Sequence, residues 1–242
     1  MKIPDNVFHD AVHGFWDKRL TQRQTQALSG RIDQSNRSDV TGGKQMDGFA
    51  LVLTDLLVAA GIPPAAIHVR KSLTVLPGYF RPTKTYDFLV VLGGRFPAAV
   101  ELKSQVGPSF GNNFNNRAEE AMGSAFDIWT AYREGAFGSA PPPWLGCLLV
   151  LEDCQASRTP IKLSEPHFSV FQEFKSSYYA TRYELFCRKM VRERHDNAAR
   201  LAACLLTADR QQAGEQINYA EPADDLSAEN FLAGLMRHVA PV

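Results

Sequence analysis

The stretches Tyr86-Asp87-Phe88-Leu89-Val90-Val91 and Ala98-Ala99-Val100-Glu101-Leu102-Lys103 decide the fold of this chain. The pair Gly93-Gly94 lies between them, and a glycine turn between two β-prone segments predicts a hairpin. Side chains alternate faces along a strand, so Glu101 and Lys103 share one face. Asp87 opens the first strand and Glu101 and Lys103 close the second, so the hairpin brings all three to one end of the sheet.

Two carboxylates and a lysine at a sheet end predict a Mg²⁺ site with a cation beside it. Charges at strand ends are common, and Glu-x-Lys alone is a weak signal. The apolar setting strengthens it, because a carboxylate at the end of an apolar run is costly to bury unless it is paired or metal-bound. This Asp…Glu-x-Lys arrangement resembles that of the PD-(D/E)xK nucleases.

Phosphodiester hydrolysis needs a polarised phosphate, an activated water and help for the leaving oxygen, and a divalent metal supplies all three. Mg²⁺ prefers oxygen ligands and keeps several waters. We therefore predict Asp87, Glu101 and the backbone carbonyl of Leu102 as metal ligands. Lys103 is predicted to orient or help deprotonate the attacking water and to stabilise charge on the phosphorane. Asp47 is either an outer acid or a helix cap, and Asp55 has no assigned role.

Length and composition fit one large domain. The chain has 242 residues, 45% of them hydrophobic, which suffices for a full core. We expect a cytoplasmic location without membrane contact, because no apolar run approaches the roughly 20 residues that span a bilayer and no signal-peptide pattern is present. The four cysteines lack zinc-ligand spacing and are expected to be reduced.

The net charge is zero, but its distribution is uneven. Residues 67–86 carry four basic side chains and no acid, and 158–200 carry nine basic against five acidic. Residues 201–242 carry two basic against six acidic. A neutral total is compatible with a basic DNA-facing surface, and equally with ordinary solvated helix faces.

The order of elements predicts an α/β (α+β) fold with a mixed central sheet flanked by helices. We expect helices over about 6–28, 48–60, 114–135, 168–175, 178–208 and 227–239. Strands are expected over about 66–76, 86–92, 97–103 and 144–151, with a long loop over 30–46.

Two further patterns admit functional and structural interpretations. Gly107-Pro108-Ser109-Phe110-Gly111 matches the G-x-S-x-G elbow of serine hydrolases, with His167 or His195 as base, but the motif is short and Ser109 follows the strand too late. In Asn112–Arg117, four asparagines and an arginine either cap and solvate a helix or read adenine and guanine in the major groove.

The chain resembles the XhoI family of type II restriction endonucleases, within the PD-(D/E)xK superfamily. The resemblance is carried by Gly42–Phe49, Leu76–Lys84, the block from Ala98 to Ala121, and Tyr183–Lys189. Tyr86 stands where the superfamily often has proline.

The resemblance implies one restriction-endonuclease-like domain over 1–242, with a nuclease core about 47–151 and a helical C-terminal part about 165–242. It implies Mg²⁺-dependent cleavage of double-stranded DNA at the palindrome CTCGAG with 5′ cohesive ends, a homodimer, and a companion DNA methyltransferase that need not touch the enzyme. An alternative is a non-cleaving DNA-binding protein on the same fold.

Residue type suggests which side chains contact DNA. For base contacts we predict the 36–46 loop and the 112–117 segment, and for phosphate contacts two basic residues before the hairpin. The predicted residues are Asn36, Arg37, Lys44, Gln45, Arg81, Lys84, Asn112, Asn113, Asn115, Asn116 and Arg117.

Overall fold

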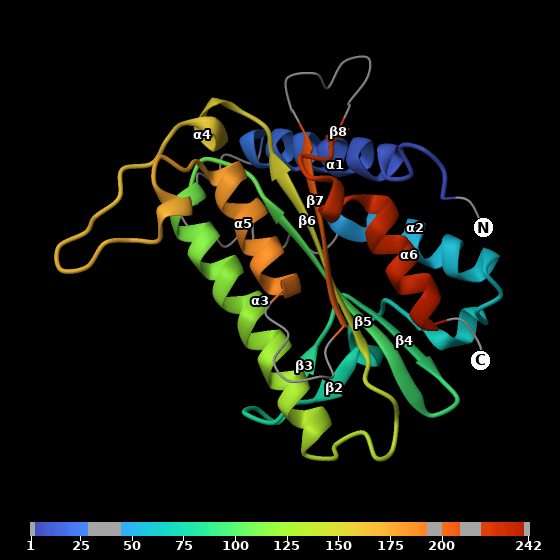
Figure 1. Ribbon diagram of the computed structural model, residues 1–242. Helices are drawn as coiled ribbons and strands as arrows, with labels where there is room; N and C mark the ends of the chain where they lie inside the picture. The colour runs from blue at the N-terminus through green and yellow to red at the C-terminus, as the bar shows by residue number, and fades with distance from the viewer. Residues whose placement is uncertain (1–2, 29–44, 193–199, 209–218, 240–242) are drawn as a thin grey trace.

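The computed structural model describes residues 3–28, 45–192, 200–208 and 219–239. Over these residues six strands form a mixed sheet in the order β1-β4-β5-β6-β7-β8, and β2 and β3 pair separately (Figure 1). The strands are β1 (Ile67–His68), β2 (Val75–Pro77), β3 (Thr83–Thr85), β4 (Phe88–Leu92), β5 (Arg95–Gln105), β6 (Trp144–Glu152), β7 (Arg200–Ala208) and β8 (Tyr219–Ala220). The helices are α1 (His9–Leu28), α2 (Asp47–Ala59), α3 (Phe110–Arg133), α4 (Gln155–Arg158), α5 (Tyr179–Arg192) and α6 (Ala228–Val239). The predicted mixed sheet flanked by helices is confirmed.

The predicted hairpin is the antiparallel pair β4 and β5. Gly93 and Gly94 form its turn with φ angles of 58° and 74°, the left-handed values that a two-residue hairpin turn requires and that glycine adopts without steric cost. Phe88 is paired with Val100. Because the strands are antiparallel, the residue before Phe88 faces the residue after Val100, which sets Asp87 opposite Glu101.

The other half of the sheet is parallel. Strand β5 pairs in parallel with β6, and β6 pairs in parallel with β7. Helix α3 connects β5 to β6, and the connection from β6 to β7 includes α5; both helices cover the same face (Figure 1). All nine residues of β6 are buried, as expected for a central strand covered on both faces.

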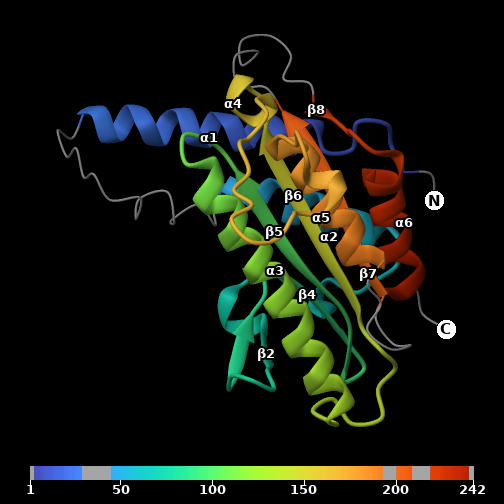
Figure 2. The same ribbon diagram turned by 60° about the vertical axis from the view of Figure 1, so that its left-hand side comes forward.

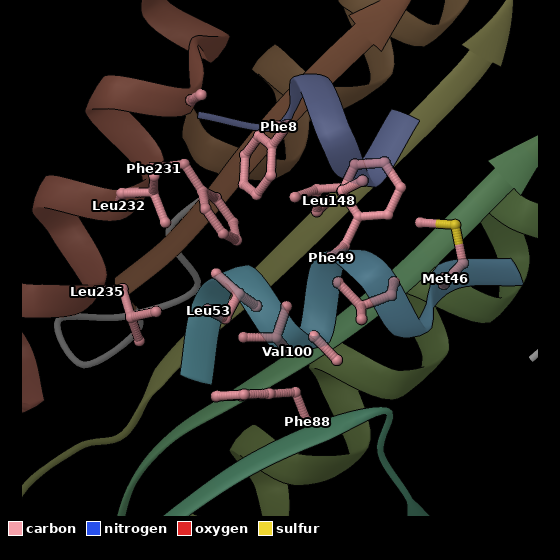
Figure 3. Packing of buried hydrophobic residues seen from close by; sticks show 14 of the residues in the cluster. Phe8, Met46, Phe49, Leu53, Phe88, Val100, Leu148, Phe231, Leu232 and Leu235 are labelled. Atoms are coloured by element: carbon pink, nitrogen blue, oxygen red, sulfur yellow. The ribbon is translucent and has the colours of Figure 1, made fainter. Parts of the chain in front are cut away.

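Helices α1, α2 and α6 cover the opposite face. Figure 3 shows Phe49 of α2 and Phe231 of α6, together with Phe8 just before α1, packed in one cluster with Val100 and Leu148 of the sheet. The even-numbered residues Val100 and Leu102 belong to this core. Alternation along β5 therefore directs Glu101 and Lys103 to the other face, toward α3 and α5.

Several predicted elements are wrong or shifted. Residues 200–208 form strand β7, so the predicted helix over 178–208 is wrong over 200–208, and its residues 193–199 lie outside the described ones. The C-terminal part 165–242 is therefore not purely helical. Only a short 3-10 turn lies within 168–175, and the predicted strand over 66–76 is divided between β1, a 3-10 turn and β2. Helix α3 begins at Phe110, four residues before its predicted start.

Asp47 does not cap its helix. Met46 holds the N-cap position of α2, and Asp47 lies in the first turn, where a carboxylate stabilises the helix dipole. In the described ranges, no helix combines the length and apolarity that crossing a membrane would require.

Candidate functional site

The hairpin brings the three predicted catalytic side chains together. Lys103 Nζ lies 2.6 Å from Glu101 Oε2 and 3.4 Å from Asp87 Oδ2. The backbone N–H of Leu102 donates to Asp87 Oδ2 over 2.9 Å, which fixes the Asp87 carboxylate against β5. One lysine thus lies between two carboxylates that come from adjacent strands.

Glu101 is the buried member of this group. Its side chain is 8% exposed, whereas the Asp87 side chain is 37% exposed. No well-aligned hydrogen bond reaches either carboxylate oxygen of Glu101 within the described structure. Two ammonium groups approach them instead: Lys103 at Oε2 and Lys84 at Oε1, the latter at 2.7 Å. A buried carboxylate needs such charge compensation.

These contacts keep Lys103 positively charged at neutral pH. Burial disfavours the charged lysine, but the Glu101 and Asp87 carboxylates outweigh burial and raise the pKa of Lys103 above its ordinary value. At this site Lys103 is therefore a donor of hydrogen bonds and a source of positive charge.

Lys84 is delivered by the separate β2–β3 hairpin, which lies beside α3 in both ribbon views (Figures 1 and 2). The connection between β2 and β3 is fastened to the helix by Asp127, whose side chain is 2% exposed. Asp127 accepts hydrogen bonds from the backbone N–H groups of Tyr79 and Phe80, each at 2.8 Å, and from Arg81 Nε at 2.6 Å. We call this set of three hydrogen bonds the Asp127 anchor.

Asp127 is not among the residues predicted from the sequence. The signal was present in the helical spacing: Asp127 lies three residues after Ser124 and six after Ala121, on the face of α3 that is buried. A carboxylate on the buried face of a helix needs partners, which the hairpin backbone supplies.

The donor set fits a hard divalent cation. Asp87, just before β4, and Glu101 on β5 offer the carboxylate oxygens that such a cation prefers, and Glu101 is buried without a well-aligned donor in the described structure. In the described part of the chain no three His, Cys, Asp or Glu side chains cluster as a metal cage. A cation here would therefore rely on two carboxylates, backbone oxygen and water, which is typical of Mg²⁺.

The predicted DNA-contacting residues have different surroundings. Asn112, Asn115 and Asn116 are exposed in the first turns of α3, and Asn113 and Arg117 are half-buried. Arg117 pairs with Glu120 at 2.8 Å. Asn36, Arg37 and Lys44 lie outside the described residues.

The remaining three make contacts within the protein. Gln45 is buried and accepts a hydrogen bond from Arg19 over 2.7 Å. Arg81 takes part in the Asp127 anchor. Lys84, predicted to contact phosphate, is paired with Glu101.

The G-x-S-x-G motif has a packing explanation. A Cβ on Gly107 would lie 2.9 Å from the Phe110 ring, and one on Gly111 would lie 2.8 Å from the Tyr179 hydroxyl. A side chain at either position would force the neighbouring aromatic side chain to shift. Ser109 occupies the N-cap position of α3, and no hydrogen bond within the described residues joins it to His167.

Comparison with known proteins assigns the family. The family described as restriction endonuclease XhoI matches residues 25–221. The chain belongs to the XhoI family of restriction endonucleases. It is 55% identical over 213 residues to the type II restriction enzyme BstVI of Geobacillus stearothermophilus, covering 86% of this chain and 92% of that enzyme.

Two further relatives carry the same description. Identity to the type II restriction enzyme XhoI of Xanthomonas vasicola is 48% over 189 residues, covering 77% of this chain and 75% of the relative. Identity to the type II restriction enzyme AbrI of Azospirillum brasilense is 51% over 159 residues, covering 66% and 71%. No solved structure matches the chain. As an XhoI-family member the chain is a restriction endonuclease, and the serine-hydrolase interpretation has no support.

Proposed function

We propose that this XhoI-family enzyme cuts duplex DNA at the palindrome CTCGAG, using Mg²⁺ and leaving 5′ cohesive ends. The observation that carries the proposal is the buried Glu101 carboxylate, which shares Lys103 with Asp87 at the end of the hairpin. The sequence specificity rests on the relatedness to the type II restriction enzyme XhoI.

Asp87, Glu101 and the Leu102 carbonyl are the proposed metal ligands. When bound, Mg²⁺ would polarise the scissile phosphate and lower the pKa of a nucleophilic water. Lys103 donates hydrogen bonds beside these ligands, where it can hold the attacking water and stabilise negative charge that develops on the phosphate. The Leu102 N–H keeps Asp87 in place for this task.

The first turns of α3 are the proposed reader of base edges. Asn112, Asn115 and Asn116 share one helix face because they are spaced three and four residues apart, and asparagine pairs bidentately with adenine. Arg117 has a buried Nε without a partner in the described structure, so binding of guanine would satisfy it. Each good bidentate contact is worth about 1–3 kcal/mol, so Arg117→Ala should relax or abolish recognition.

A palindromic site calls for a two-fold homodimer that places one catalytic group on each strand. The cellular companion would be a DNA methyltransferase that protects the host site, without contact to this enzyme. Because such an enzyme acts on DNA inside the cell, we place it in the cytoplasm.

The test is cleavage of a plasmid that carries one CTCGAG site, with and without Mg²⁺, and with a plasmid that differs in one base of the site as control. We expect a single Mg²⁺-dependent cut, and sequencing of the ends should show a 5′ overhang. Glu101→Gln and Lys103→Ala should each abolish cutting, whereas Glu229→Gln, exposed on α6 at the opposite face of the sheet, should cut normally. Retained cutting by Glu101→Gln or Lys103→Ala would end the catalytic assignment.

A further inference from the structure

Glu101 is contacted by a second lysine that the Asp…Glu-x-Lys pattern does not contain. Lys84 Nζ lies 2.7 Å from Glu101 Oε1, and its side chain is 20% exposed. The same ammonium donates to the Thr85 carbonyl over 3.0 Å and lies 5.2 Å from the centre of the Tyr86 ring. Lys84 thus points into the catalytic centre.

The two lysines reach Glu101 from different supports. Lys103 belongs to the same strand as Glu101, two residues on, so the geometry of β5 holds it at Oε2. Lys84 comes from the β2–β3 hairpin, which over the described residues forms a sheet of its own, separate from the six-stranded one. Its four-carbon stem is flexible, so it can leave Oε1 without disturbing β5.

The charges at this site balance without a metal. Asp87 and Glu101 bring two negative charges, and Lys84 and Lys103 bring two positive charges. A divalent cation on Glu101 would add two more positive charges within a few ångströms of both lysines. Repulsion of that kind is strong in a partly buried site, so one ammonium must move away.

We propose that Lys84 holds the cation position on Glu101 Oε1 until a divalent metal binds, and that the metal displaces it. The inference rests on the proposed function, because it takes Glu101 as a metal ligand. Lys84 is then a positioning residue that keeps the buried carboxylate compensated and competes with the metal. Its own positive charge stays near the site after displacement.

Binding of Mn²⁺ without DNA tests the proposal. Mn²⁺ prefers the same oxygen ligands as Mg²⁺, and free Mn²⁺ is quantified by electron paramagnetic resonance. Lys84→Met should bind Mn²⁺ at least tenfold more tightly than the wild type, because a competing cation is gone. Lys84→Arg, which keeps the charge, should stay close to the wild type. Lys71→Met, which removes a lysine in the segment before β2, should bind within about twofold of it.

The two possible failures are distinguishable. If Glu101→Gln binds Mn²⁺ as tightly as the wild type, the metal is not on Glu101 and the proposed catalytic centre itself is wrong. If Glu101→Gln loses binding while Lys84→Met binds no more tightly than the wild type, Lys84 is a fixed structural partner and only the displacement is overturned.

A measurement on the wild type covers the case in which Lys84→Met does not fold. A brief pulse of acetic anhydride followed by mass spectrometry reports how reactive each lysine amine is. Saturating Mn²⁺ should raise the acetylation of Lys84 at least threefold relative to Lys71, because the displaced amine gains access to solvent. Unchanged acetylation of Lys84 at a Mn²⁺ concentration that saturates the protein would overturn the proposal.

Discussion

Removal of the Asp127 carboxylate is the sharpest structural test of how the site is assembled. Asp127→Ala deletes the acceptor of two backbone N–H groups and of the Arg81 guanidinium. A hydrogen bond to a charged group is worth about 1.5–3 kcal/mol, and the two backbone bonds lie at the lower end because their donors can reach water. Arg81 is 42% exposed, so its pair adds only about 0.5 kcal/mol.

The expected loss is therefore about 3.5 kcal/mol of the free energy of unfolding. For a chain of this size, that loss lowers the melting temperature by about 7–14 °C. Urea unfolding followed by circular dichroism measures the first quantity and thermal unfolding the second. Glu119→Ala, on the same helix, is the matched control and should stay within about 0.5 kcal/mol of the wild type.

The pH dependence gives an independent check of the anchor. Burial opposes the charge on Asp127, but the hydrogen bonds from Phe80, Arg81 and Tyr79 prevail and lower the pKa of this carboxyl below its ordinary value of 3.8. A lowered folded-state pKa means that the stabilisation is fully present above 3.8 and is lost as the pH falls through the folded-state value. The stability difference between wild type and Asp127→Asn should therefore shrink below that pH. An Asp127→Ala protein with wild-type stability at pH 7 would refute the anchor.

Three further predictions address packing and burial. Gly146→Ala should lower the free energy of unfolding by about 1–3 kcal/mol, because its Cβ would lie 2.5 Å from a buried tryptophan ring. Gly123→Ala has open space around its Cβ and should stabilise α3 by about 0.5–1 kcal/mol. If urea unfolding shows that Gly146→Ala is stabilised and Gly123→Ala destabilised, the contact at Gly146 is refuted. Tyr183→Phe should lower the free energy of unfolding by about 1–2 kcal/mol in the same assay, because the Tyr183 hydroxyl donates a hydrogen bond to the buried Gln105 Oε1 over 2.8 Å. An unchanged midpoint of urea unfolding would mean that Gln105 Oε1 has another hydrogen-bond donor. Burial raises the pKa of the Cys187 thiol well above its ordinary value of 9.0. At pH 8 iodoacetamide should therefore label Cys187 only after unfolding. Rapid labelling of Cys187 in the folded protein, detected by mass spectrometry, would contradict its burial.

The β4–β5 hairpin was predictable because its determinants are local. Gly93-Gly94 sets the turn, and strand alternation then places Glu101 and Lys103 on one face without reference to the rest of the chain. The sequence shows the positive charge of Lys84 but not its contact with Glu101, because that contact depends on how the β2–β3 hairpin packs against α3. Asp127 fixes that packing by contacts to residues more than forty positions away in the sequence. A local sequence pattern does not show which distant residues are in contact.

Strand β7 shows where local reasoning fails. Residues 200–208 read Arg-Leu-Ala-Ala-Cys-Leu-Leu-Thr-Ala, and alanine and leucine favour helix by intrinsic propensity. Periodicity does not separate a fully buried strand from a buried helix. The segment is a strand because β6 offers it a parallel partner along its whole length, and pairing with that partner outweighs the local preference.

The Gly93–Gly94 turn has a practical consequence for handling this enzyme. It is exposed, and it lies six residues along the chain from Asp87, which corresponds to about 20 Å at the rise of an extended strand. Exposed loop tips with small residues tolerate insertion well. An affinity peptide, or a short peptide that carries a fluorophore, inserted between Gly93 and Gly94 would hold the enzyme on a support or report on it from a position remote from Glu101 and Lys103.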